Sequence, residues 1–176
     1  MNVKTQELFN FYSHLAGMLA AAIGTIYLAK VASSSASALV TALIYGVSVL
    51  FVFSASSLYH AFKKEDNEMS FRRKMDRLAI FFMTAGTFTP MCYFCLDGPY
   101  KWSMLSLQWG LVGFGVFSQL FFPRAPRKLY AAIYLAMGWS ALFTIDQVLA
   151  KFSVAQGVLL FSGGASFTIG GIIYEI

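Results

Sequence analysis

Three residues of this sequence place a hydroxyl, an imidazole and a carboxylate near the ends of two long apolar runs. Ser56 and His60 are four residues apart, a spacing that puts both side chains on one face of a helix. Asp76 stands at the start of the next apolar run. Polar groups in membrane segments are energetically costly, so their presence suggests a function. The three residues are therefore the first candidates for a site.

The chemistry that these residue types favour is metal-assisted hydrolysis. A neutral imidazole is a common transition-metal ligand, and a carboxylate beside it can hold a metal-bound water. A zinc ion held near these residues would lower the pKa of its water to about 7 and create a hydroxide nucleophile. Amides and esters of membrane lipids would be within reach of that hydroxide.

Each of these residues also has a structural interpretation. A histidine near the end of a membrane helix is more often an interfacial residue, or a hydrogen-bond partner for a neighbouring helix, than a metal ligand. Asp76 lies where an acidic side chain can cap a helix and offset its dipole, which is the more common role. Ser56 has small residues on both sides and can simply allow close helix packing.

The composition identifies the elements around these residues as membrane helices. Of the 176 residues, 58% are hydrophobic and only 12% are charged, whereas soluble domains carry about 25% charged residues. A membrane-spanning helix needs roughly 20 apolar residues. The first run is too long for a signal peptide and is expected to be retained. The sequence predicts one all-α integral membrane domain over residues 1–176 with six transmembrane helices, at Phe11–Ala32, Leu39–Phe62, Leu78–Leu96, Trp102–Phe122, Leu129–Leu149 and Phe152–Tyr174.

The basic residues predict the orientation of these helices. Ten of the thirteen Lys and Arg residues fall in the N-terminal segment, in 63–77 and in 124–128, which six spans place on one side. The positive-inside rule assigns that side and the N-terminus to the cytoplasm. The expected partner of this charge is the anionic inner leaflet; nucleic acid is not expected, because no recognisable nucleic-acid module surrounds these residues. His14, His60 and Asp76 all fall at this end, so they can share one site.

Cys92 and Cys95 form a second pattern with possible chemistry. Cys92 lies 16 residues after Asp76, which is roughly 24 Å along a helix. The pair therefore cannot join a site at the cytoplasmic end. Its spacing favours small packing residues, with a disulfide or a metal site as the alternative.

Longer motifs connect these residues to a known family. Ser56-x-x-x-His60 is followed by a basic linker, by Met75-Asp76-Arg77-Leu78-Ala79-Ile80-Phe81 and by Ala85-Gly86-Thr87-Phe88-Thr89-Pro90. Asn10-x-x-Ser13-His14 opens the first helix, and Gly163-Gly164-x-x-Phe167-Thr168-x-Gly170-Gly171-x-x-Tyr174 lies in the sixth. In this order, and over nearly the whole chain, the motifs resemble the hemolysin III family, bacterial relatives of the progestin and adipoQ receptors.

The resemblance implies a seven-helix bundle with zinc near the cytoplasmic face, bound by one histidine of the second helix and two of the seventh. By position it implies His60 as a zinc ligand, Asp76 as the carboxylate that holds the zinc-bound water, and Ser56 as a nearby hydroxyl. Distant relatives hydrolyse ceramides, so a zinc-dependent lipid amidohydrolase, or a lipid-sensing protein of membrane homeostasis, is expected in the bacterial plasma membrane. The family name implies an alternative, a membrane-permeabilising cytolysin, although no predicted helix has the polar stripe that lines a channel.

The chain departs from the family at its C-terminal end. It stops at Ile176, where the family continues into a seventh helix, and its only histidines are His14 and His60. One histidine with Asp76 is a poor zinc site by ligand count. We therefore expect this C-terminally shortened chain to bind zinc weakly or not at all, with His14 as the weak substitute ligand. A bundle of six helices is expected to face lipid or a second copy in a homo-oligomer.

Overall fold

The computed structural model describes the backbone of residues 3–64, 70–122 and 124–175, and the side chains of residues 6–64, 70–122 and 124–173. The side chains of Lys4 and Tyr174 lie outside the described residues. Every element in the described ranges is helical, and six segments are long and apolar enough to cross a membrane, which confirms the predicted all-α class. The elements are α1 (Val3–Ala32), α2 (Ala36–Phe62), α3 (Phe71–Cys95), α4 (Gly98–Phe121), α5 (Arg127–Trp139), a 3-10 turn (Ser140–Thr144), α6 (Ile145–Lys151) and α7 (Val154–Glu175).

Two of the helices begin well before their apolar runs. α1 begins at Val3 rather than near Phe11, and α3 begins at Phe71 rather than at Leu78. Counting apolar residues finds only the part of a helix that matches the hydrocarbon core, so polar first turns are missed. His14 consequently lies well inside α1, not in its first turn.

The start of α3 is capped by Ser70 and not by Asp76. The Ser70 hydroxyl accepts a hydrogen bond from the backbone N–H of Arg73 at 3.2 Å. Asp76 lies in the second turn, beyond the free N–H groups that a capping side chain must reach. The interpretation of Asp76 as a helix cap is therefore wrong, and its carboxylate is available for other contacts.

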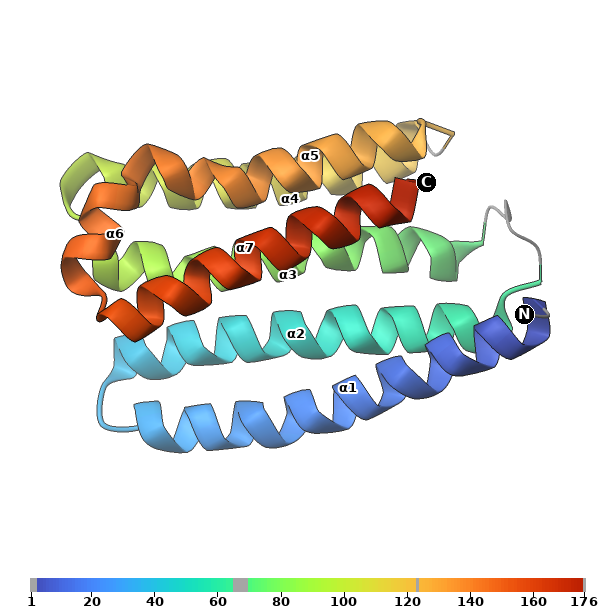
Figure 1. Cartoon of the computed structure of the whole chain (residues 1–176), viewed down its shortest axis with the longest axis horizontal. Helices are drawn as coiled ribbons and strands as arrows, with labels where there is room; N and C mark the ends of the chain where they lie inside the picture. Colours follow the sequence, from blue (N-terminus) through green and yellow to red (C-terminus); the bar gives the residue numbers. More distant parts are fainter. Residues whose placement is uncertain (1–2, 65–69, 123, 176) are drawn as a thin grey trace.

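Each of the first four helices packs against the next one in the chain (Figure 1). α1 packs antiparallel against α2, α2 against α3 and α3 against α4, while α7 packs on α5. α1 begins and α7 ends at the same end of the bundle, as six spans require. We call this the basic end, because it carries Lys63, Arg72, Arg73, Lys74, Arg77, Arg124, Arg127 and Lys128. Its assignment to the cytoplasm remains a prediction. The other end, with Ser33, Asp97 and Lys151, is called the opposite end.

Small residues allow α1, α2 and α3 to approach closely. Gly46 of α2 lies against Thr25 of α1, and Gly86 of α3 lies against Ser48 of α2. A Cβ at either glycine would collide with its partner, so a larger residue would force the helices apart. This use of small residues is typical of helix packing in membranes, where burial of apolar surface does not drive association.

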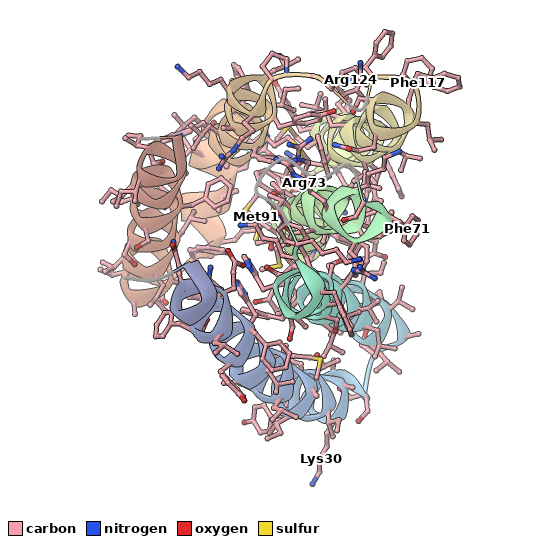
Figure 2. All side chains as sticks on the ribbon, turned by 90° about the vertical axis from the view of Figure 1, so that its right-hand side faces the viewer. Lys30, Phe71, Arg73, Met91, Phe117 and Arg124 are labelled. Carbon is pink, nitrogen blue, oxygen red and sulfur yellow. The ribbon has the colours of Figure 1, made fainter. Side chains whose placement is uncertain are left out.

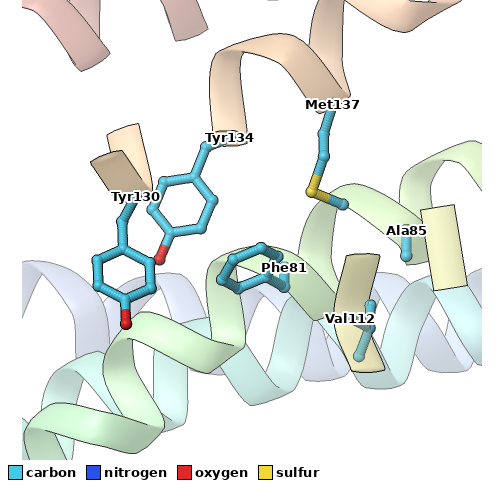
Figure 3. Packing of buried hydrophobic residues seen from close by; sticks show 6 residues of the cluster. All are labelled: Phe81, Ala85, Val112, Tyr130, Tyr134 and Met137. Atoms are coloured by element: carbon cyan, nitrogen blue, oxygen red, sulfur yellow. The ribbon is translucent and has the colours of Figure 1, made fainter. Parts of the chain in front are cut away.

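Apolar side chains divide between a packed interior and a lipid-facing exterior. Seen from the basic end, Phe71 and Phe117 point away from the bundle, whereas Met91 points toward its interior (Figure 2). One interior cluster joins α3, α4 and α5 and is drawn in Figure 3; it contains Phe81, Ala85, Val112, Tyr130, Tyr134 and Met137. α1 and α7 have the least buried spans, so their apolar faces are left to lipid or to another subunit. Self-association remains a prediction.

The fifth span is interrupted, whereas the sequence predicted a continuous helix over Leu129–Leu149. A 3-10 turn at Ser140–Thr144 separates α5 from α6. The fully buried side chain of Gln108 donates hydrogen bonds to the Met137 carbonyl at 3.1 Å and to the Ser140 hydroxyl at 2.8 Å. In a 3-10 turn, backbone hydrogen bonds join residues three apart instead of four. The hydrogen bond from the buried Gln108 side chain to the Met137 carbonyl offsets the lost helical bonding.

Candidate functional site

A cavity of about 730 Å³ opens at the basic end between five helices. Its wall combines charged and polar groups with apolar and aromatic ones, which suits a ligand that has both characters. α1 contributes Gln6, Glu7, Asn10 and His14; α2 and the residue after it contribute Val52, Phe53, Ser56, His60 and Lys63; α3 contributes Asp76, Arg77 and Ile80; α5 contributes Arg127, Tyr130, Ala131, Tyr134 and Leu135; and α7 contributes Phe167, Gly170, Gly171 and Ile173. We call it the polar cavity.

The four residues singled out from the sequence all line this cavity. Ser56 and His60 lie one turn apart on α2, Asp76 faces them from α3, and His14 reaches in from α1. The structure thus brings the four together, while their roles in catalysis and in metal binding remain predictions.

His60 is held by a hydrogen-bond network that crosses from α2 to α1. Its Nδ1 lies 2.6 Å from Oε2 of Glu7, and Nζ of Lys63 donates to Oε1 of the same carboxylate at 2.7 Å. The side chains of all three residues are about 15–16% exposed. Charge-assisted hydrogen bonds with this little exposure are stronger than their counterparts on a solvated surface.

The rings of His14 and His60 are stacked. Their centroids are 5.6 Å apart and their planes differ by only 3°. The two imidazoles are therefore neighbours in the wall of the polar cavity.

Asp76 is paired with Ser56 across the α2–α3 contact. The Ser56 hydroxyl is a hydrogen-bond partner of the Asp76 carboxylate, and His60, His14 and Arg77 are close enough to act on its charge. Ser56 itself is buried, so this hydroxyl has a partner inside the bundle rather than in water. The packing interpretation of Ser56 is incomplete, because its hydroxyl contributes a polar contact as well as small volume.

The α5 wall of the cavity is fixed by two tyrosines of the interior cluster. The hydroxyl of Tyr134 donates to the backbone carbonyl of Arg77 at 2.8 Å. The guanidinium of Arg77 lies over the ring of Tyr130, 5.4 Å from its centroid. These contacts connect α5 to the turn of α3 that carries Asp76, so the carboxylate is supported from the rear of the cavity.

Glu7 and Lys63 received no role from the sequence. The first helix was predicted to begin near Phe11, and Glu7 was therefore left outside it. A signal was present, because Glu7 and His14 are seven residues apart and share one helix face once the helix is extended. Lys63 was counted only as one charge of a basic linker.

The described residues do not fit zinc as a complete ligand set. Within these residues no group of three His, Cys, Asp or Glu side chains is arranged to hold a metal ion. A catalytic zinc takes about three protein ligands, and because Nδ1 of His60 is bound to Glu7, that ring has only Nε2 left for a metal ion. The zinc implied by the family resemblance therefore remains a prediction for this chain, and we assign no chemical step to it.

A second, largely apolar cavity of about 640 Å³ lies farther from the basic end. Phe167 of α7 lines both cavities, so the two are neighbours on either side of one side chain. Next to it, the indole of Trp139 donates to the hydroxyl of Thr168 at 3.1 Å. We call this the apolar cavity; its wall includes Tyr45, Met83, Phe88, Leu142, Phe152, Leu159 and Leu160.

Cys92 and Cys95 are not among the residues that line the polar cavity, as predicted. Both thiols are free and buried, and they pack in a cluster with Phe88, Met104 and Val148. Among the described residues they belong to no metal-binding group.

Comparison with known proteins identifies relatives over nearly the whole chain. The family model described as haemolysin-III related matches residues 2–176. The chain is 30% identical to Hemolysin-3 of Bacillus cereus over 171 residues, which cover 96% of this chain and 78% of that protein. It is also 30% identical to the Hemolysin-3 homolog of Bacillus subtilis (strain 168), with 96% of this chain and 80% of that protein covered. No solved structure matches the chain.

Proposed function

Because this chain belongs to the haemolysin-III related family and is a multi-pass integral membrane protein, we propose that it binds a membrane lipid amide and hydrolyses it. One observation supports this proposal above the others. The polar cavity, which contains Asp76, Ser56 and His60, adjoins the apolar cavity at Phe167. A lipid needs such a pair of compartments, one for its polar head and one for its acyl chain.

The volumes of the two cavities suit an amphiphile. Ligand sites in proteins usually measure about 300–1,000 Å³ and combine apolar walls with a few polar groups. The polar cavity of about 730 Å³ and the apolar cavity of about 640 Å³ are each in that range. A small soluble metabolite would leave the apolar cavity unused, which favours a lipid as the ligand.

The acid–base groups of the polar cavity suit hydrolysis of an amide. A water oxygen forms a bond to the amide carbonyl carbon, and the bond between that carbon and nitrogen breaks. Asp76 accepts a proton from the water and returns it to the leaving nitrogen, so that the products are a fatty acid and an amine. Ser56 orients the carboxylate, and His60 supplies a second acid–base group. General acid–base catalysis of this kind contributes about 10²–10⁴-fold.

The test is lipid turnover by the purified chain in vesicles. We expect fatty acid release from an N-acyl lipid amide, and saturable binding without release for an analogue whose amide is replaced by an ether. Asp76→Asn should remove turnover while the protein still inserts in the membrane. Asp97→Asn, at the opposite end, is the matched control and should leave turnover unchanged. Binding without turnover in the wild type would leave a lipid-sensing role and contradict hydrolysis; absence of both would contradict the proposal.

The cytolysin alternative receives no support from the described residues. The polar groups gather at the basic end, while the half toward the opposite end contains the apolar cavity and the cluster around Cys92. A conducting pore would need polar lining along its full length. We expect dye-loaded vesicles to retain their contents when the protein is present, and leakage that rises with protein concentration would favour the cytolysin instead.

A further inference from the structure

We propose that Glu7 is a positioning residue, which fixes the tautomer and the ring orientation of His60 so that Nε2 of His60 offers its lone pair to the polar cavity. The proposal concerns the same cavity as the proposed function. It does not depend on the ligand being a lipid amide, because it is a statement about the free protein.

The donor in the contact between Glu7 and His60 is the imidazole. Oε2 of Glu7 and Nδ1 of His60 are 2.6 Å apart. An ionised carboxylate can only accept hydrogen bonds, so the proton of this contact belongs to Nδ1. A neutral imidazole has a single N–H. When that N–H is at Nδ1, Nε2 has a lone pair and no proton.

The carboxylate of Glu7 is itself held in place by Lys63. Lys63 donates to its other oxygen, Oε1, at 2.7 Å, so both oxygens are engaged by partners at the end of α2. A carboxylate held at both oxygens cannot rotate to release His60 without breaking the contact with Lys63. The three side chains are about 15–16% exposed, and water is a poor competitor for these bonds.

Two neighbouring aromatic rings hinder a half-turn of the His60 ring. The ring of His14 is nearly parallel to that of His60, with ring centroids 5.6 Å apart. The ring of Tyr59 lies 5.2 Å from that of His60 at an angle of 53°. Rotation by half a turn would have to pass these neighbours, and it would exchange Nδ1 for carbon at the Glu7 carboxylate.

These contacts together hold His60 with its Nδ1–H donated to the Glu7 carboxylate. A ring N–H donated to a carboxylate fixes the tautomer and increases the basicity of the other nitrogen. The nitrogen left over, Nε2, is the one that can take a proton from a water or a substrate in the polar cavity. Glu7 acts through His60, so the effect of losing Glu7 is expected in the state of that ring.

The experiment is nuclear magnetic resonance of the ring nitrogens. The protein is labelled with ¹⁵N-histidine in lipid nanodiscs, without added ligand and well above the usual histidine pKa of about 6.5. The chain has only two histidines, and His60→Gln identifies which signals belong to His60. We expect the wild type to show His60 with a protonated Nδ1 and a bare Nε2.

Three variants separate positioning from a general structural effect. Glu7→Ala should move most of the His60 proton to Nε2, because Nδ1 loses its acceptor. Glu7→Asp keeps a carboxylate that can accept from Nδ1 and should retain more of the wild-type tautomer than Glu7→Ala. Asp97→Ala removes the ion pair with Lys151 at the opposite end and should leave the His60 signals unchanged.

Two results would overturn the proposal. One is a wild-type His60 with its proton on Nε2, which needs no variant and is independent of folding defects. The other is a folded Glu7→Ala protein in which the tautomer of His60 is unchanged. Because the measurement uses no lipid amide, failure of the turnover assay leaves it intact, and failure here leaves the turnover assay to be judged separately.

Discussion

The two ends of the bundle each have an acid–base ion pair, and the pairs differ in what surrounds them. At the basic end, Glu7 and Lys63 are 2.7 Å apart and about 15–16% exposed. At the opposite end, Asp97 and Lys151 are 2.8 Å apart, and their side chains are 76% and 42% exposed. The distances are nearly equal, so geometry alone does not distinguish the pairs.

The two pairs differ in how far they are buried and in whether a third residue joins them. The Glu7 carboxylate also binds His60 and lines a cavity, whereas the Asp97 carboxylate faces water. An exposed pair contributes little because solvent screens it, while a group with few water contacts depends on its partners. An acidic residue paired with a lysine thus contributes to a site at one end and only to the surface at the other.

The largest expected effect distinguishes Asp76 from Asp97. Asp76→Asn should lower lipid amide turnover by at least about 100-fold, because an amide cannot accept the proton of the attacking water. Asp97→Asn should leave turnover unchanged. Both rates are measured at equal amounts of membrane-inserted protein. Equal turnover by the two variants would remove the functional difference between the two ends.

The next effect concerns stability. Glu7→Ala removes two charge-assisted hydrogen bonds and should lower the free energy of unfolding by about 1.5–3 kcal/mol. Thermal unfolding in detergent provides the measurement. Asp97→Ala serves as the control and should have a much smaller effect. If the control destabilises the protein as much as Glu7→Ala does, burial is not what distinguishes the pairs.

A smaller effect tests the cap of α3. Ser70→Ala should lower the free energy of unfolding by about 1 kcal/mol, because the N–H of Arg73 loses its acceptor. Ser70→Asp keeps an acceptor and should restore most of the stability. Turnover should respond only weakly, since Ser70 does not line the polar cavity. A Ser70→Ala protein as stable as the wild type would contradict the capping role of Ser70.

The pair at the opposite end should respond to pH. The hydrogen bond from Lys151 lowers the pKa of Asp97 below its usual value. Because the folded pKa is the lower one, any stabilisation by this pair is fully present above the usual Asp pKa of about 3.9 and is lost as the pH falls through the folded pKa. Wild type and Asp97→Asn should therefore unfold at slightly different temperatures at neutral pH and at the same temperature in acid. A difference that persists in acid would show that Lys151 is not its cause.

The smallest expected signal is that of bound zinc. We expect the purified chain to hold much less than one zinc per molecule after dialysis, with any residual binding lost in His60→Ala. Elemental analysis gives the stoichiometry. One tightly bound zinc per chain would contradict this expectation, and His14→Gln would then test His14 as the additional ligand.

Much of the fold followed from local sequence features. The apolar runs located six spans, and the motifs around His60 and Asp76 led to the family that the comparisons identify. The errors fell where local patterns are weakest. Counting apolar residues locates only the part of a helix inside the hydrocarbon core. It therefore missed the first turns of α1 and α3, and with them the position of Glu7. The break at Ser140 depends on Gln108 of another helix, which no pattern within the fifth span contains.

By itself the sequence determined that this protein is a membrane bundle and which ionisable groups lie at one end of it, because hydrophobicity and charge are properties of segments. Only the tertiary structure decided which groups meet. The contact of Glu7 with His60 joins residues 53 positions apart, and the pairing of Ser56 with Asp76 crosses from α2 to α3. Such contacts depend on how α1, α2 and α3 are rotated about their axes, which is set by the close packing at Gly46 and Gly86.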